Sequence, residues 1–250
     1  MKRVNDIYEY LQTFAPLELQ LGFDNAGIQI GRLSNSVTRV LLALDVTSEV
    51  VSEAAELGAE LIVSHHPLIF TPIKNITDDT LLRLAREDIA VISMHTNLDI
   101  AEGGVNDVLL ALFNAERKDY LDEDNCGRVG ELAQELDLSE FLIECKAALN
   151  ANGLRYYDAG RRVKRIAVMG GSGGDYVADA VNKGCDTYIT ADIKHHQFLL
   201  AKELNINLID ADHYCTENPV IPAVAAKLQA AFPEVEFTVS KVHKQIAQFI

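Results

Sequence analysis

Histidines are the residues with the clearest chemical potential in this chain. The sequence has 7 histidines, and six come just after a predicted strand or at the start of the next helix: His65, His66, His95, His195, His196 and His213. Carboxylates accompany them at Asp45, Asp99, Asp192, Asp210, Asp212 and Glu217. The carboxyl ends of parallel strands form the crevice in which α/β proteins bind ligands. We therefore expect this set near a binding site.

The first cluster is the sequence SHHP at residues 64–67. Adjacent side chains of an extended strand point in opposite directions, so His65 and His66 can serve two ions lying side by side better than they can clamp one. Pro67 favours an extended backbone at His66. The alternative is a polar turn at a strand end.

The second cluster contains His95 and ends at Asp99, which offers oxygen ligands after a buried strand. Asp99 could instead cap a helix near the glycines at 103 and 104. In the third cluster, His213 and Glu217 are four residues apart, so one helical turn would place them on one face. Pro219 indicates that the regular helix begins only after Glu217. That carboxylate could bridge two ions, or it could be a surface charge near a helix N-terminus.

Together the clusters supply three imidazoles and two carboxylates, which is the mixture that borderline divalent metals prefer. Two ions sharing five protein ligands keep positions open for water, as catalytic metals do. The candidate ligands are His65, His66, Asp99, His213 and Glu217.

A glycine-rich stretch, GGSGG at residues 170–174, lies between a predicted strand and a helix. Exposed amides at a helix start attract phosphate, so this loop could hold a phosphorylated ligand. It lacks the Gly-Lys-Ser/Thr of a Walker A sequence. The alternative is a tight turn that lets the chain approach a neighbour closely.

Composition excludes several classes of protein. The chain has 250 residues, 48% hydrophobic and 24% charged, with a net charge of -15. This mixture is typical of a globular protein, and the acidity disfavours nucleic-acid binding without excluding it. No apolar stretch reaches the roughly 20 residues of a membrane span. The 4 cysteines are widely spaced, which argues against a zinc finger or a disulfide framework and favours the cytoplasm.

The elements that must position these residues alternate between strands and helices. Strands are predicted at 40–44, 61–63, 89–93, 166–169, 187–189, 206–209 and 235–239. Helices are predicted at 48–57, 80–87, 104–113, 139–149, 176–183, 194–204 and 220–231. This order indicates an α/β fold with largely parallel strands in mixed sheets. Residues 57–64 and 183–190 resemble each other, so we expect two related α/β lobes. The first lobe, residues 1–120, would hold His65, His66 and Asp99, and the second, residues 126–250, would hold His213 and Glu217.

The ordered set of these sequences resembles the NIF-three-like family, whose members are named GTP cyclohydrolase 1 type 2 homologues. The resemblance rests on FDNAGIQIG at 23–31, SHHP at 64–67, HTNLD at 95–99, GGSGG at 170–174, TADIKHH at 190–196, and the pair His213 and Glu217. The resemblance spans nearly the whole chain. The members that the chain resembles are of the short bacterial form, which lacks an inserted middle domain. Phe23 stands where many members have tryptophan.

The resemblance implies a two-metal centre between the lobes and a toroidal homohexamer. It implies two divalent ions per chain (Zn, Fe, Mn or Ni), with His66 and Asp99 on one ion, His65 and His213 on the other, and Glu217 bridging them. It also implies a hydrolase in which metal-activated water opens a C–N bond of a nucleotide or related heterocycle. His95 and His196 are the candidates for proton transfer, or they could orient the ligands. The alternatives are a metal-binding assembly or partner-binding protein without turnover, and a dinuclear phosphoesterase.

Overall fold

A computed structural model describes the whole chain, residues 1–250. Its internal contacts divide it into two compact units. Unit 1 comprises Met1–Glu102 and Val220–Lys244, and unit 2 comprises Gly103–Pro219 and Gln245–Ile250. These bounds differ from the expected lobes, because residues 220–244 pack with the first unit rather than with the second. No helix is both long enough and apolar enough to cross a membrane.

Unit 1 is built on a mixed five-stranded sheet. The strand order is β13-β4-β5-β6-β2, with β13 (Glu236–Val239), β4 (Arg39–Ala43), β5 (Leu61–Ser64), β6 (Ala90–Ser93) and β2 (Gly27–Ile30). All neighbours are parallel except β2, which runs antiparallel to β6. The pairing of β13 with β4 explains the unit boundary, since the last strand completes the first sheet. A separate two-stranded ribbon joins β1 (Lys2–Arg3) and β3 (Ser36–Val37).

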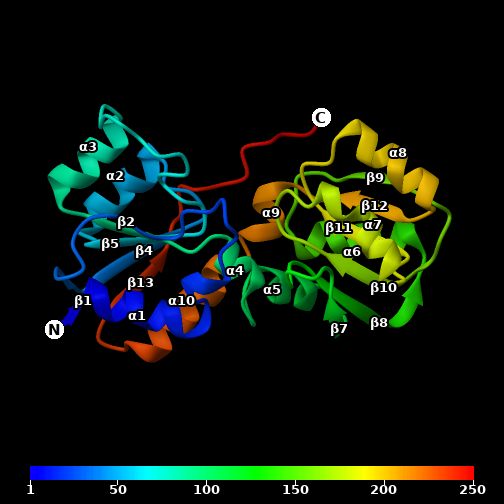
Figure 1. Cartoon of the computed structure of the whole chain (residues 1–250), viewed down its shortest axis with the longest axis horizontal. Coiled ribbons are helices and arrows are strands. Elements are labelled where there is room, and N and C mark those ends of the chain that lie inside the picture. The colour runs from blue at the N-terminus through cyan, green and yellow to red at the C-terminus, as the bar shows by residue number, and fades with distance from the viewer. The chain divides into compact units, whose positions relative to one another are not determined.

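Helices cover both faces of this sheet (Figure 1). One face carries α2 (Ser48–Leu57) and α3 (Asp79–Glu87), and the other carries α1 (Val4–Phe14) and α10 (Val220–Ala231). Because both faces are covered, β5 and β6 are buried along their whole length. Helix α2 ends at Leu57 and is followed by Gly58, whose φ of 64° gives the helix a left-handed C-cap. Two short helices, η1 (Leu17–Leu19) and α4 (Thr96–Ile100), complete the unit.

Unit 2 has a mixed six-stranded sheet of order β7-β8-β10-β11-β12-β9. Its strands are β7 (Glu116–Tyr120), β8 (Arg128–Leu136), β10 (Val163–Val168), β11 (Thr187–Thr190), β12 (Asn207–Asp210) and β9 (Arg155–Tyr157). The three central strands are parallel, and β7, β8 and β9 are antiparallel additions that the sequence analysis missed. The central strands repeat the β4-β5-β6 arrangement of unit 1. The prediction of an α/β fold with mixed sheets is confirmed.

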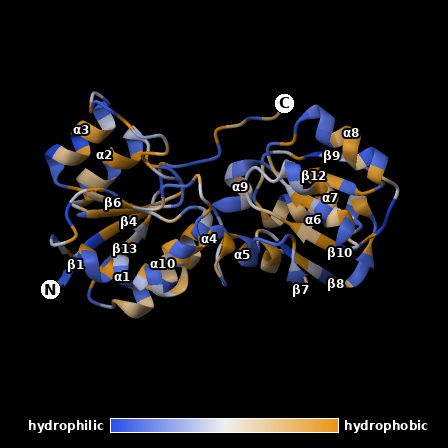
Figure 2. Ribbon diagram, viewed as in Figure 1, coloured by the Kyte–Doolittle hydropathy of each residue, from blue (hydrophilic) through white to orange (hydrophobic).

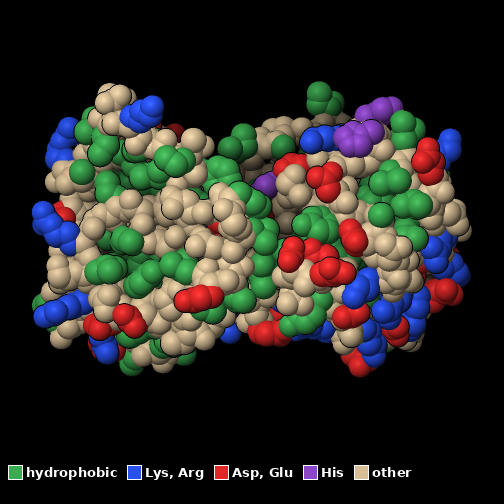
Figure 3. Space-filling view, viewed as in Figure 1, with side chains coloured by type: hydrophobic (Ala, Val, Ile, Leu, Met, Phe, Trp, Pro, Cys, Tyr) green, Lys and Arg blue, Asp and Glu red, His purple; other side chains and the backbone are tan.

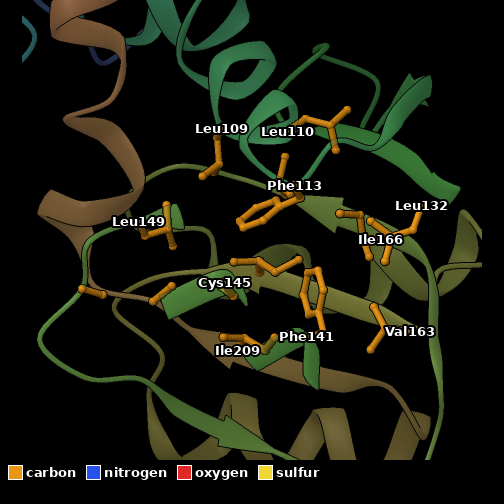
Figure 4. Packing of buried hydrophobic residues seen from close by; sticks show 14 of the residues in the cluster. Leu109, Leu110, Phe113, Leu132, Phe141, Cys145, Leu149, Val163, Ile166 and Ile209 are labelled. Carbon is orange, nitrogen blue, oxygen red and sulfur yellow. The ribbon is translucent and has the colours of Figure 1, made fainter. Parts of the chain in front are cut away.

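The core of unit 2 lies between one face of this sheet and the helices α5 (Val105–Leu112) and α6 (Leu138–Ala148). Figure 4 shows Phe113 and Phe141 within it, beside Ile166 and Ile209 of the sheet. Helices α7 (Val177–Asn182) and α8 (His195–Leu204) pack on β11 and β12. Figure 2 shows hydrophobic residues concentrated on the strands of both sheets. The remaining elements are η2 (Gly174–Tyr176) and α9 (His213–Glu217).

Charged side chains of both signs mix on the part of unit 2 where β7 and β8 lie (Figure 3). Many of the basic groups there are paired with acids. The ion pairs include Lys118 with Glu116, Arg165 with Glu131, Lys183 with Asp119, and Arg162 with Glu135 and Asp137. Paired cations offer little to a phosphate backbone, which agrees with the acidity of the chain.

Candidate metal centre

The ends of β5 and β6 place a group of histidines in unit 1. The hydroxyls of Ser64 and Ser93, which end these strands, lie 2.8 Å apart. The Met94 amide donates to the Ser64 carbonyl at 2.8 Å, which joins the two strand ends. His65 and His66 leave the first strand, and His95 leaves the second. Their metal-binding nitrogens lie within 4.8 Å of one another, close enough to hold a metal ion.

His65 is fully buried, and its ring has one defined orientation. Its Nδ1 lies 2.8 Å from the Met94 carbonyl oxygen. A carbonyl only accepts, so Nδ1 donates the proton and Nε2 of the neutral ring carries the lone pair. This Nε2 is 3.7 Å from Asp99 Oδ1. The geometry favours His65 and Asp99 as ligands of one ion, which differs from the expected pairing of His66 with Asp99.

His66 is oriented by a carboxylate that also binds a second histidine. Asp45 Oδ1 accepts from His66 Nδ1 at 2.7 Å, and Asp45 Oδ2 lies 2.9 Å from His243 Nε2. Burial would raise the pKa of Asp45, but the hydrogen bonds from His243 and His66 hold it well below its ordinary value. The basic residues around His243 near the C-terminus would predict a solvated side chain, but that side chain is only 7% exposed.

His95 pairs with Asp24 from the FDNAG segment. The distance from His95 Nδ1 to Asp24 Oδ1 is 2.8 Å, and Asp24 Oδ2 accepts from the Thr96 amide at 2.9 Å. Burial would raise the pKa of Asp24, but the hydrogen bonds from His95 and Thr96 lower it to about 2. An ionised Asp24 accepts the hydrogen bond of His95 Nδ1, which orients the ring.

In unit 2, His213 and Glu217 lie on one turn of α9, as their spacing predicts. His213 Nε2 is 3.0 Å from Glu217 Oε2, and its Nδ1 is 2.7 Å from Asp192 Oδ2. Burial lowers the pKa of His213, but the hydrogen bonds and charges of Glu217 and Asp192 outweigh this and raise it to about 9. A regular turn does begin before Pro219, because the Asp212 side chain caps α9 by accepting from the Cys215 amide.

The glycine-rich loop packs against this pair. Gly171 has a φ of 64°, and a Cβ there would overlap Glu217 Oε1 and lie 3.2 Å from His213 Nε2. The amides of Gly170, Gly171 and Gly173 donate to Asn106 Oδ1, Thr216 Oγ1 and Thr190 Oγ1 respectively, at 2.9–3.0 Å. These amides are already used inside the protein. The structure therefore favours the close-approach interpretation of this loop over the phosphate cradle.

His195 and His196 start α8 with exposed side chains, and neither belongs to a metal-binding group. Figure 3 shows histidine side chains at the surface where α8 lies. The role of His196 in proton transfer stays a prediction. Asp24 was not among the predicted site residues. Its only signal was its place in the FDNAG segment, which has no regular periodicity.

Taken together, the fold and these groups define an α/β protein with histidine and carboxylate side chains that could bind metal ions. Residues 2–246 match the Duf34/NIF3 (NGG1p interacting factor 3) family. The chain belongs to this family.

Individual relatives agree with this assignment. A GTP cyclohydrolase 1 type 2 homolog of Clostridium perfringens is 39% identical, over 99% of this chain and 100% of that protein. A GTP cyclohydrolase 1 type 2 of Helicobacter pylori is 32% identical, over 92% of this chain and 93% of that protein. The crystal structure of a Bacillus cereus protein related to NIF3 has the same fold, with a TM-score of 0.95 at 24% identity, over 100% of this chain and 99% of that one.

Proposed function

We propose that this protein is a dinuclear metal-dependent hydrolase that opens a C–N bond of a nucleotide or related heterocycle. One observation carries the proposal. The Nδ1 atoms of His65, His66, His95 and His213 each have an acceptor within hydrogen-bond distance, which fixes the orientation of every ring. Metal-binding histidines are typically held in this way. The names of the relatives support the choice of bond.

The residues that would hold two divalent ions are His65, His66, Asp99, His213 and Glu217. Their nitrogen and oxygen donors fit Zn, Fe, Mn or Ni, and the two oxygens of Glu217 fit a bridging position. Such ions lower the pKa of bound water and polarise a reacting C–N carbon. The fit rests on the donor types and on the fixed rings of the histidines.

His95 and Asp24 would move a proton. Asp24 holds the Nδ1 proton of His95, so the Nε2 lone pair can accept a proton from a nucleophile and return it to the leaving nitrogen. The centroid of the His95 ring lies 5.3 Å from that of His65 and 5.7 Å from that of His66. His196 has no part in this proposal, because its side chain is exposed.

Experiments can also favour either of two alternative functions, a phosphoesterase or a metal-binding assembly protein. A phosphoesterase loses its main support, since the amides of Gly170, Gly171 and Gly173 in the glycine-rich loop are occupied. A metal-binding assembly protein would bind ions without turning over any nucleotide.

The test is to incubate metal-loaded and chelator-treated protein with GTP and to follow the products by mass spectrometry. We expect a product heavier by one water, formed only by the metal-loaded protein. His95→Asn should keep the metal content and lower turnover by roughly 10²- to 10⁴-fold. Full metal content with no product from GTP or other purine nucleotides would contradict the proposal and favour the assembly protein.

A further inference from the structure

Two large aromatic side chains of unit 1 are exposed close to the histidine group. Phe23 is 63% exposed and Phe70 is 50% exposed. Their ring centroids lie 6.3 Å apart with an interplanar angle of 62°. Exposed aromatic rings next to polar groups are characteristic of ligand sites.

The aromatic pair lies next to the histidine group. The Phe70 ring is nearly perpendicular to the His95 ring, with centroids 6.0 Å apart and an interplanar angle of 88°. His95 is in turn beside His65 and His66. A flat ligand that stacks on Phe70 would therefore have its edge near His95 and the metal-binding nitrogens.

The segments that present these rings are clamped together. Asn25 Nδ2 donates to the Ile69 carbonyl at 2.6 Å, and the Ile69 amide donates to Gln29 Oε1 at 3.1 Å. Gln29 Nε2 also donates to the Asn25 carbonyl at 2.6 Å. These bonds join the segment after Phe23 to the residue before Phe70. The two segments that carry the rings are thus joined by hydrogen bonds, which suits a preformed stacking surface.

We infer that Phe23 and Phe70 form an aromatic subsite for the planar heterocycle of the substrate, a purine base, in which Phe70 stacks on the base and the inclined ring of Phe23 borders it. The inference rests on the proposed function, and it deepens that function by naming what recognises the base. Stacking on an aromatic side chain tolerates any flat ring and contributes strongly to binding. Other groups would then form hydrogen bonds with the polar atoms of the base. The aromatic subsite would fix the plane of the base beside His95.

The test measures binding rather than turnover. GMP and ribose 5-phosphate, which lacks the base, are titrated by calorimetry into the full-length, metal-loaded protein. We expect GMP to bind more tightly than ribose 5-phosphate. Phe23→Ala and Phe70→Ala should each weaken GMP binding by roughly 10- to 100-fold and leave ribose 5-phosphate unchanged. Phe70→Trp should retain GMP binding, which guards against misfolding as the cause.

The matched control is the double variant Ile73→Ser, Ile76→Ser. These side chains are 47% and 60% exposed in the segment that follows Phe70, but they are aliphatic and offer no ring to a base. GMP affinity should be unchanged in this variant. The inference is overturned if GMP does not bind, if both ligands bind equally, or if the phenylalanine variants bind GMP normally. A change in oligomer mass in those variants, with normal GMP affinity, would show that the rings face a second copy.

The two proposals fail separately. Base-dependent binding with no turnover of any purine nucleotide would reject the hydrolase and keep the subsite. Turnover that is insensitive to the loss of both rings would reject the subsite and keep the hydrolase.

Discussion

Three aspartates orient histidine rings of this chain. Asp24, Asp45 and Asp192 each accept a hydrogen bond from the Nδ1 of a histidine, at 2.7–2.8 Å. The carboxylate fixes the tautomer and the ring orientation, and it makes the opposite nitrogen more basic. Metal affinity should therefore depend on residues that would not touch a metal.

Asp192→Asn tests this dependence in unit 2. We expect affinity for Zn²⁺ to fall by roughly 10- to 100-fold, because the amide no longer stabilises the Nδ1 proton of His213. Competition with a chelating dye measures the change. Asp124→Asn removes an exposed carboxylate of the same unit and should have no effect. Equal affinity in the Asp192 variant and the unaltered protein would show that the hydrogen bond is only structural.

Gly171→Ala tests the packing of the glycine-rich loop on the candidate ligands. The new Cβ would overlap Glu217 Oε1, so we expect weaker metal binding together with some loss of stability. Gly184→Ala is the matched control, because Gly184 has a similar φ of 73° and nothing within 4 Å of the position of a Cβ. Both variants carry left-handed strain, of roughly 1 kcal/mol. If metal affinity falls equally in both, the strain alone is responsible.

The sequence predicts the candidate ligands better than their partners. His65, His66, Asp99, His213 and Glu217 follow strand ends, and strand ends can be read from periodicity. The partners come from elsewhere in the chain. Asp24 reaches His95 across 71 residues, and nothing local in either segment indicates that contact.

At the level of elements, prediction succeeded where one physical pattern dominates. The buried parallel strands have continuous apolar runs, and α2 and α10 have the predicted bounds, 48–57 and 220–231. Strand β8 was missed because charged residues interrupt its pattern. Arg128 starts this strand and is fully buried, since Asp107 of α5 accepts two of its hydrogen bonds, at 2.8 and 3.0 Å. That ion pair is a tertiary feature that the local sequence does not show.

Helix α6 gives a pH-dependent prediction. Burial raises the pKa of its Cys145 thiol to about 12. In the unfolded chain the thiol ionises near its ordinary pKa, about 8.5, so the unfolded state loses its proton first as pH rises. The free energy of unfolding should therefore fall between about pH 9 and pH 12.

Cys145→Ala should make this decline shallower when denaturant unfolding is measured at several pH values. Leu138→Ala, also on the buried face of α6, is the control. It should lower stability by roughly 2–5 kcal/mol without changing the slope against pH. An identical slope in the Cys145 variant and the unaltered protein would mean that the thiol ionises as easily in the folded state as in the unfolded chain.

For the whole molecule, the resemblance between residues 57–64 and 183–190 suggested two related lobes, and each unit does contain a set of three parallel strands. The sequence did not reveal that the last helix and strand return to unit 1. That return depends on the pairing of β13 with β4, which lie 197 residues apart at Arg39 and Glu236. Local patterns identify strands but not their partners.

Assembly is a further property of the whole molecule. From the resemblance to the family, we propose a homohexamer. Light scattering should then give a mass close to six chains of 27.5 kDa. Closed symmetry would let these acidic protomers bury a self-complementary face. A mass of one chain at micromolar protein concentration would contradict the hexamer.

The central claim is that the histidines and carboxylates of this chain bind two metal ions, and metal analysis of the purified protein tests it most directly. Mass spectrometry of the metals should find about two divalent ions per chain. Glu217→Gln should lower the occupancy of both, because it removes the charge that they share. Protein that binds no ion when metal is supplied, or full occupancy in the Glu217→Gln variant, would contradict a centre bridged by Glu217.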